Sequence, residues 1–316
     1  MPSETLIRIR LLEERDLPEA GRIFRIAFGT ALGHPDPESM FPGRDLVSTR
    51  WRANPRAAFA AEDDGRLVAT SFAANWGSFG FFGPLTVRPE YWGRGIAQAL
   101  LEPTMALFGE WNIEHRGLFT IPNSPKHIRL YEKYGFQAGY LTAIFGKAVS
   151  RPNDARFRRL SALPPDEQEA AVGACRALTG EILAGLDVTG EIRAVLAQGL
   201  GDACLVQDGP ALAAFAVCHV GGGTEAGDGT CFVKFGAVRP SADADSDLGR
   251  LVTACEALAL DLGVDRLSLG TNMGRRRAYE QIRRLGFRTE IIGVSMETHP
   301  ERSYNRPHVY VIDDWR

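Results

Sequence analysis

Hydrophobic and polar residues near the start of the chain alternate mainly with the two-residue period of β-strands. The segments with this alternation, or with the apolar run of a buried strand, are residues 6–10, 57–61, 67–75 and 78–87. One helical stretch interrupts them at residues 17–28, directly after Asp16, a residue type that favours helix N-caps. Residues 29–44 carry three prolines and three glycines and are predicted to be irregular. An Asp64-Gly65 pair between two of the strands predicts a tight hairpin turn.

From Gly93 onward the hydrophobic period becomes helical. Apolar side chains recur on one side of residues 93–111, although Pro103 within this segment removes one backbone hydrogen bond. A strand, a short helix and a closing strand then follow at residues 117–121, 126–134 and 140–149. Because strands and helices are mixed in this order, we expect an α+β fold with a mixed, mostly antiparallel sheet flanked by helices.

The second half of the chain repeats the first. Two short motifs recur at a constant interval of 151 residues: Val87-Arg88-Pro89 as Val238-Arg239-Pro240, and Gly135-Phe136 as Gly286-Phe287. A fixed interval without net insertion indicates a duplicated unit. We therefore predict two tandem domains of one fold, residues 1–150 and 151–316, with a linker at 151–154.

Composition and charge narrow the class of protein. Of the 316 residues, 45% are hydrophobic and 24% are charged, which is typical of globular proteins rather than disordered chains. A formal net charge of −3 gives no basic footprint for nucleic acid. No apolar run approaches the roughly 20 residues that span a bilayer, and residues 1–10 contain no apolar signal segment. We therefore expect no membrane partner and a cytoplasmic location.

The cysteines give no sign of a metal site. All five lie in the second half, at Cys175, Cys204, Cys218, Cys231 and Cys255. Their number is odd, and neither C-x-x-C spacing nor a Cys/His pair of zinc-binding type is present. We expect scattered, reduced thiols in the core and no bound metal.

The segment with the most chemical information is residues 85–97, LTVRPEYWGRGIA. A predicted strand ends, a turn follows, and a helix opens on Gly93 and Gly95. Unpaired amides and the helix dipole make such a helix start attractive to anions, and glycines let a pyrophosphate approach the backbone. Taken alone, the two glycines fit an ordinary Gly-rich turn equally well. The G-x-G-x-x-G spacing of a dinucleotide-binding loop is absent.

This segment resembles the acyl-CoA loop of the GNAT (GCN5-related N-acetyltransferase) family, in which Gln/Arg-x-x-Gly-x-Gly/Ala follows a strand. Residues 124–136, SPKHIRLYEKYGF, resemble the second motif of the family, a short helix that carries Leu-Tyr and ends in Gly-Phe. Together the matches extend over residues 6–149. The resemblance implies two tandem GNAT-like domains, acetyl-CoA as co-substrate and N-acetyltransferase activity.

The resemblance also implies roles for individual residues. The implied cofactor-binding positions are Leu85, Thr86, Val87, Trp92, Gly93, Arg94, Gly95, Ile96, Ala97, Asn123 and Ser124. Among them, the amides of residues 93–97 would bind the CoA pyrophosphate. The strand edge at residues 85–87 would pair with pantetheine and polarise the thioester carbonyl. Tyr131 would be the general acid that protonates the departing thiolate, because a phenol with a pKa of about 10 remains protonated at pH 7.

Two positions depart from the family pattern. Trp92 stands where Gln or Arg is usual, and Ser124 stands where Asn is common, with Asn123 beside it as a substitute. Periodicity alone would make Tyr131 a packed aromatic residue, and only its position before Gly135-Phe136 favours the catalytic role.

The general base is left open. Glu62, His34, Asp36 and Glu38 are candidates, although each fits a solvated surface position better. A group of aromatic residues lies on and beside the strand predicted at 78–87. These residues could line an apolar acceptor cavity or be buried beneath the second domain, and we expect burial. This group consists of Trp76, Phe79, Phe81 and Phe82.

The second copy has lost the features of the first. Residues 93–96 correspond to Ala-Asp-Ser-Asp at 244–247, and Tyr131 corresponds to Ile282. With Asp243, three carboxylates occupy the place of a pyrophosphate, so we predict a solvated acidic loop without CoA binding. The arginines at 275–277 are expected to be a solvated helix start. Residues 308–316 are expected to fray, with docking against the body of the protein as the alternative.

The leading hypothesis is an N-acetyltransferase that moves an acetyl group directly from acetyl-CoA to an amine. The acceptor is a small molecule or a peptide of unknown identity. Residues 1–150 would be the catalytic domain, and residues 151–316 would shape the acceptor cleft. The alternative is a non-catalytic acyl-CoA sensor or interaction module. The sequence leaves the acyl-chain preference and the oligomeric state open.

Overall fold

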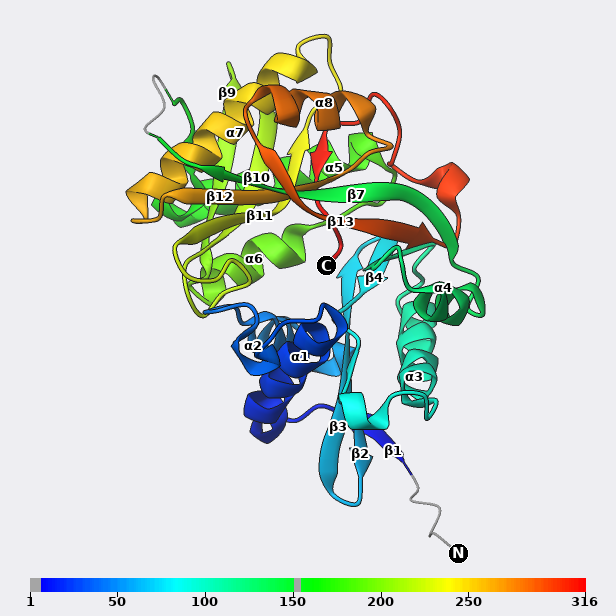
Figure 1. Cartoon of the computed structure of the whole chain (residues 1–316). Coiled ribbons are helices and arrows are strands. Elements are labelled where there is room, and N and C mark those ends of the chain that lie inside the picture. Colours follow the sequence, from blue (N-terminus) through cyan, green and yellow to red (C-terminus); the bar gives the residue numbers. More distant parts are fainter. Residues whose placement is uncertain (1–6, 151–154) are drawn as a thin grey trace, which may run out of the picture.

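A computed structural model describes residues 7–150 and 155–316 (Figure 1). The linker predicted at 151–154 lies outside these residues. The main elements of the first half follow in this order: β1 (Arg8–Leu11), α1 (Leu17–Ala31), α2 (Leu46–Ala53), β2 (Ala58–Asp63), β3 (Arg66–Trp76), β4 (Phe79–Phe82), β5 (Thr86–Val87), α3 (Ile96–Glu110), β6 (His115–Thr120), α4 (Pro125–Glu132) and β7 (Gln137–Ala148). This alternation of strands and helices confirms the α+β expectation.

The second half repeats this order of elements, with one continuous strand, β11, in place of β4 and β5. Its elements are β8 (Arg158–Arg159), α5 (Pro165–Ile182), α6 (Thr189–Ala197), β9 (Gly201–Asp208), β10 (Ala211–Val220), β11 (Thr230–Val238), α7 (Ala244–Asp261), β12 (Arg266–Asn272), α8 (Arg276–Arg284) and β13 (Arg288–Glu297). A short additional strand, β14 (Val311–Ile312), follows near the end of the chain.

The halves share one continuous sheet because they exchange their last long strands. Along the sheet the order is β1-β2-β3-β4-β6-β13-β7-β12-β11-β10-β9-β8. β13 of the second half pairs with β6, β7 of the first half pairs with β12, and β7 and β13 pair with each other across the middle of the molecule (Figure 1). The closing strand predicted at 140–149 is therefore confirmed as a strand, but its neighbours are β12 and β13 rather than β6.

Buried polar side chains link the exchanged strands. Thr142 of β7 shares a hydrogen bond with Ser295 of β13 at 2.7 Å and accepts one from Asn272 of β12 at 3.0 Å. His115 of β6 pairs with Glu297 of β13 at 2.6 Å. All of these side chains are buried. A shift of β7 or β13 by one residue would separate these partners and bury polar groups without hydrogen bonds, so the contacts favour a single register.

Helices cover both faces of the sheet. In the first half, α1 and α2 lie on one side of β2–β4, and α3 and α4 lie on the other (Figure 1). In the second half, α7 and α8 pack over one cluster of buried side chains, and α5 and α6 pack over another. Among the helices of the described residues, none is both long and apolar enough to cross a membrane.

Several local predictions need correction. Helix α2 was not predicted, and the interruption between α1 and α2 is shorter than the irregular segment expected at 29–44. The strand expected at 78–87 is interrupted around Gly83-Pro84 and becomes β4 and β5. Asp16 directly precedes α1, but its carboxylate accepts hydrogen bonds from Arg10 and from the Glu13 amide instead of capping the helix. The Asp64-Gly65 turn is confirmed, since both residues have positive φ.

The aromatic residues around β4 are buried, as we expected. Trp76, Phe79 and Phe81 are at most 1% exposed and belong to the same core cluster as α5 and α6. Trp76 contacts Phe235 of β11 edge to face, with ring centroids 5.2 Å apart. Phe82 points to the opposite face of the sheet, into a second cluster. These rings therefore fill the core and do not line an acceptor cavity.

The end of the chain is docked, so the expectation of a frayed tail is wrong. Residues Tyr310 to Trp315 are at most 4% exposed. The solvated start expected at α8 is also wrong for Arg275, which is 1% exposed and forms an ion pair with Asp313 at 2.5 Å. The physical reason is charge complementarity, because each buried group supplies the partner that the other requires.

We predict that the two halves unfold together, because they share a sheet and each completes the other's hydrogen bonding through an exchanged strand. In urea, tryptophan fluorescence and far-UV circular dichroism should follow one coincident transition, and calorimetry should show one peak. Two resolved transitions would show that the halves are energetically independent, contrary to this prediction.

Candidate active site

The centre of the candidate site is a bulge between β4 and β5. β4 pairs in parallel with β6, from Phe79 opposite His115 to Phe81 opposite Gly117. The pairing with β3 slips by one residue between Phe82 and Thr86, so one extra residue is inserted there. Beyond the bulge, β5 pairs with β3, while β6 continues beside β13. The two parallel strands therefore diverge and leave a gap between them.

The edge of β5 that faces this gap presents the main-chain N–H and C=O of Val87. The Arg88 amide donates to the Val68 carbonyl at 2.9 Å, on the β3 side. Because hydrogen-bonding directions alternate along an antiparallel pair, the N–H and C=O of Val87 point to the opposite edge. The Val87 carbonyl accepts a hydrogen bond from the Trp92 indole at 2.7 Å. Trp92, 42% exposed, thus braces the following loop against β5.

The loop after β5 ends at a helix start with open amides. Gly93 and Gly95 have φ of 82° and 79°, a region that disfavours residues with a Cβ, and a Cβ on either would meet no atom within 4 Å. The first helical hydrogen bond runs from the Ala99 amide to the Gly95 carbonyl, so the amides of residues 96–98 precede the ladder. The first turn of α3 holds no acidic residue. This helix start is suited to an anion.

Arg94 and Ile96 differ in their surroundings. The Arg94 guanidinium lies over the Tyr91 ring, 4.7 Å from its centroid, in a cation–π contact. Ile96 is 2% exposed and anchors the first turn of α3 to the core. Ala97 follows Ile96 on the first turn of the helix.

Tyr131 reaches the gap from α4. It is 8% exposed and packs edge to face on Phe82, with ring centroids 5.6 Å apart, directly before the bulge. Burial raises the pKa of Tyr131 to about 12, although a hydrogen bond with Thr120 acts in the opposite direction. Thr120 lies on the part of β6 that has diverged from β5. The phenol is thus held in its protonated form next to the gap.

Asn123 and Ser124 precede α4. Ser124 occupies the N-cap position, and its main-chain oxygen accepts from the His127 amide at 3.1 Å, while its side chain makes no capping hydrogen bond. Asn123 lines a shallow hollow together with Arg129 and Glu132. Ile96 and Val87 belong to one core cluster, Tyr131 belongs to the neighbouring one, and Leu85 packs against both. Asn123 and Ser124 lie in the loop between β6 and α4.

The corresponding helix start in the second half is different. Asp245 accepts a hydrogen bond from the Tyr310 hydroxyl at 2.8 Å, and Asp247 is 7% exposed and pairs with Arg250. The interpretation as a fully solvated acidic loop is therefore wrong for these two residues. Ile282, at the position that corresponds to Tyr131, is fully buried.

Three of the four candidate bases have partners among the described residues. Glu62 pairs with Arg10 at 2.8 Å, and Glu38 pairs with Arg22 at 2.6 Å. The His34 ring lies 2.7 Å from the Asp36 main-chain oxygen. Asp36 and Glu38 are exposed, as expected, whereas the Glu62 side chain is only 18% exposed, so the expectation of a solvated position is wrong for Glu62.

Sequence reasoning missed a buried ionic group beside the bulge. Arg50 of α2 donates to the Gly83 carbonyl and pairs with Glu225 at 2.8 Å, and Glu225 also pairs with Lys234 at 2.7 Å. Burial by itself would raise the pKa of Glu225, but Arg50 and Lys234 outweigh it and hold that pKa well below its usual range. These residues are far apart in the sequence and belong to no motif, so no local signal could have identified them.

Comparisons with known proteins agree with this geometry. Residues 22–136 match the model of the acetyltransferase (GNAT) family. A putative acetyltransferase from Pyrococcus horikoshii has a similar structure, with a TM-score of 0.69 and 15% identity over all of this chain and 96% of that one. A GCN5-related N-acetyltransferase from Sphaerobacter thermophilus has a TM-score of 0.56 and 16% identity over 92% of this chain and 95% of that one. No curated protein sequence matches the chain.

At such identities the structural likeness concerns the fold. It extends over both halves, whereas the family model covers a segment of the first half. The expected resemblance to the GNAT family is thus confirmed for residues 22–136.

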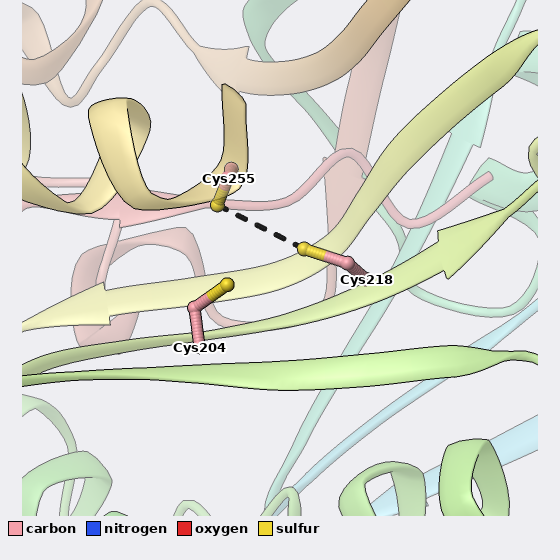
Figure 2. A group of neighbouring side chains, drawn as sticks. All are labelled: Cys204, Cys218 and Cys255. Atoms are coloured by element: carbon pink, nitrogen blue, oxygen red, sulfur yellow. Dashed lines mark hydrogen bonds between the residues drawn. The ribbon is translucent and has the colours of Figure 1, made fainter. Parts of the chain in front are cut away.

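Three of the cysteines, although far apart in the sequence, lie together in the core. Cys204 of β9, Cys218 of β10 and Cys255 of α7 have their sulfur atoms within 4.8 Å of one another (Figure 2). The Cys218 and Cys255 sulfurs are 3.8 Å apart and share a hydrogen bond. Hydrogen bonds from Cys218 and Cys255, together with burial, raise the pKa of Cys204 well above its usual value. Since a metal requires thiolates and the surroundings are apolar, the cluster is better suited to neutral packed thiols.

We predict that none of the five cysteines reacts rapidly with Ellman's reagent in the folded protein at pH 8, because all are buried and the thiolate is the reactive form. In guanidinium chloride all five should react. Rapid labelling of the folded protein, or zinc that survives dialysis against a chelator, would contradict the assignment of neutral core thiols.

Proposed function

Because residues 22–136 form a domain of the GNAT acetyltransferase family, we propose that the chain is an acetyl-CoA-dependent N-acetyltransferase. Enzymes of this family use acetyl-CoA and act on amines of small molecules or proteins. In this proposal, acetyl transfer is direct, from the thioester to the acceptor amine in a ternary complex. The acceptor is an amine of a small molecule or a peptide.

The observation that supports the proposal best is the convergence of three features on one gap. These are the edge of β5 that no strand pairs with among the described residues, the open amides at the start of α3, and the buried phenol of Tyr131. An extended amide-containing arm such as pantetheine can pair with a free strand edge as another strand would. The α3 amides would hold the pyrophosphate at one end of this arm, with the thioester near the bulge at the other.

The chemistry at the bulge follows from these positions. Main-chain groups of residues 85–87 would hydrogen-bond the thioester and polarise its carbonyl. The acceptor nitrogen would attack that carbonyl as the neutral amine, a C–N bond would form, the C–S bond would break, and the nitrogen would release one proton to solvent. Tyr131 would donate its hydroxyl proton to the departing sulfur and then recover one from solvent. Its raised pKa keeps this proton available at neutral pH.

The second half would shape the acceptor side of the cleft. The segment between α1 and α2 is bound to the β10–β11 loop by main-chain hydrogen bonds, from Asp45 N to Thr224 O at 2.8 Å and from Gly223 N to Gly43 O at 2.7 Å. These contacts support a division of roles in which residues 1–150 are catalytic. Residues 151–316 would hold in place the segment between α1 and α2, which would cover the acceptor site.

A non-catalytic acyl-CoA sensor is the alternative. Trp92 in place of Gln or Arg, and candidate bases already engaged in ion pairs, favour it. A thiol-release assay with a panel of amino acids, polyamines, aminoglycosides and peptides distinguishes the two. Turnover with any amine supports the enzyme, whereas CoA binding without thiol release across the panel supports the sensor.

We predict that the protein binds acetyl-CoA and that Gly95→Ala weakens binding about tenfold, because a Cβ at φ of 79° strains the loop and lies at the open amides. Isothermal titration calorimetry gives both affinities. Gly109→Ala, at an exposed position near the end of α3 with no atom near the added Cβ, is the matched control and should bind normally. No heat and no thermal shift for the unmodified protein would refute the proposed function.

We predict that Tyr131→Phe lowers kcat by roughly 10²–10⁴-fold and leaves the Kd of acetyl-CoA within twofold, since only the proton donor is lost. The assay uses the amine of the panel with the fastest turnover. Tyr134→Phe on the same helix, which loses a hydrogen bond to Glu102, is the control and should keep its activity.

The pH dependence provides a second check of Tyr131. The Tyr131 hydroxyl would act in its protonated form. Because its pKa is raised to about 12, this form persists above pH 10. The rate should therefore show no decreasing limb between pH 8 and pH 10. A decrease centred below pH 10 that disappears in Tyr131→Phe would contradict the assignment of the raised pKa.

A further inference from the structure

The last residues of the chain, 310–316, run through the second half and end between the two halves (Figure 1). Within this segment, β14 pairs antiparallel with β11, with Ile312 opposite Gly236 and Val311 opposite Ala237. The same residues of β11 pair with β10 on their other side. β14 therefore lies on the edge of β11 that faces β12, in the gap where these two parallel strands diverge.

This gap is the counterpart of the candidate groove in the first half. Equivalent parallel pairings begin at Phe79 opposite His115 and, 151 residues later, at Thr230 opposite Arg266. At the same interval, the bulge and edge positions Leu85 and Thr86 correspond to Gly236 and Ala237. β14 thus lies at the position that corresponds to that of pantetheine in the first half. Its main chain forms the hydrogen bonds that the edge of β11 would otherwise lack.

Main-chain and side-chain hydrogen bonds, together with an ion pair, hold β14 in this position. The Val238 amide donates to the Tyr310 carbonyl at 3.0 Å, and the Val311 carbonyl accepts from Arg275 at 2.7 Å and from Thr271 at 3.3 Å. Asp313 pairs with the same Arg275. All of these groups are buried, so release of the segment would leave Arg275 inside the protein without its carboxylate partner.

The same segment continues to the acyl-binding bulge of the first half. The Trp315 ring lies against Phe79, with centroids 4.8 Å apart. The main-chain oxygen of Arg316 accepts a hydrogen bond from Arg50. Arg50 also donates to the carbonyl of Gly83, in the bulge itself. One guanidinium therefore joins the end of the segment to the place where the thioester would lie.

We propose that residues 310–316 permanently occupy the second half's counterpart of the cofactor groove and position the bulge of the first half through Arg50. Each chain then binds one acyl-CoA, and Arg50 is a positioning residue for the thioester. The occupancy by residues 310–316 concerns the protein without ligand. The role of Arg50 rests on the proposed function, because it assumes that the first half binds acyl-CoA.

Hydrogen exchange followed by mass spectrometry tests the occupancy on the full chain. Without ligand, the amides of residues 236–238 and of Ile312 should exchange as slowly as those of the β10–β11 ladder. Addition of CoA should slow exchange around Val87 and leave these amides unchanged. Calorimetry should give one CoA per chain. Fast exchange of the Ile312 amide, CoA-dependent protection there, or two CoA per chain would overturn the occupancy.

Arg50→Lys tests the positioning role, since lysine keeps the charge next to Glu225 but cannot reach both carbonyls. The Kd of CoA should change less than twofold, while the carbonyl ¹³C resonance of bound, labelled acetyl-CoA should move toward its free position. Arg56→Gln, an exposed arginine on the turn after α2, is the control and should reproduce the original resonance. An unchanged resonance in Arg50→Lys would refute the positioning role.

A double-mutant cycle tests whether the tail acts through Arg50. Ile312→Pro removes the amide that pairs with Gly236, and Ile312→Val is its conservative control. If both residues act on the bulge by one route, the shifts in the carbonyl resonance should be non-additive. Additive shifts would overturn this route. If Ile312→Pro does not fold, Arg50→Lys and the exchange data still decide, and failure of CoA to bind would refute the proposed function without altering the ligand-free exchange result.

Discussion

Strands β6 and β12 each have an edge inside the molecule that must be paired, and in both cases the partner comes from the other half. An unpaired strand edge in the interior would leave a row of amides and carbonyls without hydrogen bonds, at a cost of about 1–3 kcal/mol for each group. The exchange of β7 and β13 satisfies both edges and fixes the distance between the two halves. It also brings α5 and α6 into one core cluster with β4.

Each half contains a place where two parallel strands diverge, and the residues around these two places differ. In the first half a glycine-rich helix start follows β5, and Tyr131 packs on Phe82 directly before the bulge. In the second half the corresponding helix begins with Asp245 and Asp247, and Ile282 replaces the tyrosine. Carboxylates at that place repel a pyrophosphate, and the strand edge is already paired with β14. In the proposed arrangement, charge and strand pairing would each disfavour acyl-CoA in the second half.

The local parts of this arrangement could be predicted from the sequence. Residues 85–97 predicted a strand end and an anion-binding helix start, because turns, glycines and helix starts depend on neighbouring residues. The constant interval of 151 residues predicted the repeated order of elements. The partners of β7 could not be predicted, since every antiparallel strand of suitable pattern offers the same main-chain groups. Arg275 could not be recognised as buried, because its partner Asp313 lies 38 residues further along the chain.

Buried charges give the tail a specificity that its short strand lacks. A two-residue strand such as β14 can slide along β11 with little loss of main-chain hydrogen bonding. The Arg275–Asp313 ion pair can form in one register of β14 only. A shift of β14 would leave one buried charge unpaired, at a cost of about 3–5 kcal/mol. Apolar side chains could give comparable stability without this constraint. We infer that the ion pair is used here for its geometry: it fixes the register of β14, and through Trp315 and Arg50 that register reaches the bulge on which acetyl transfer would depend.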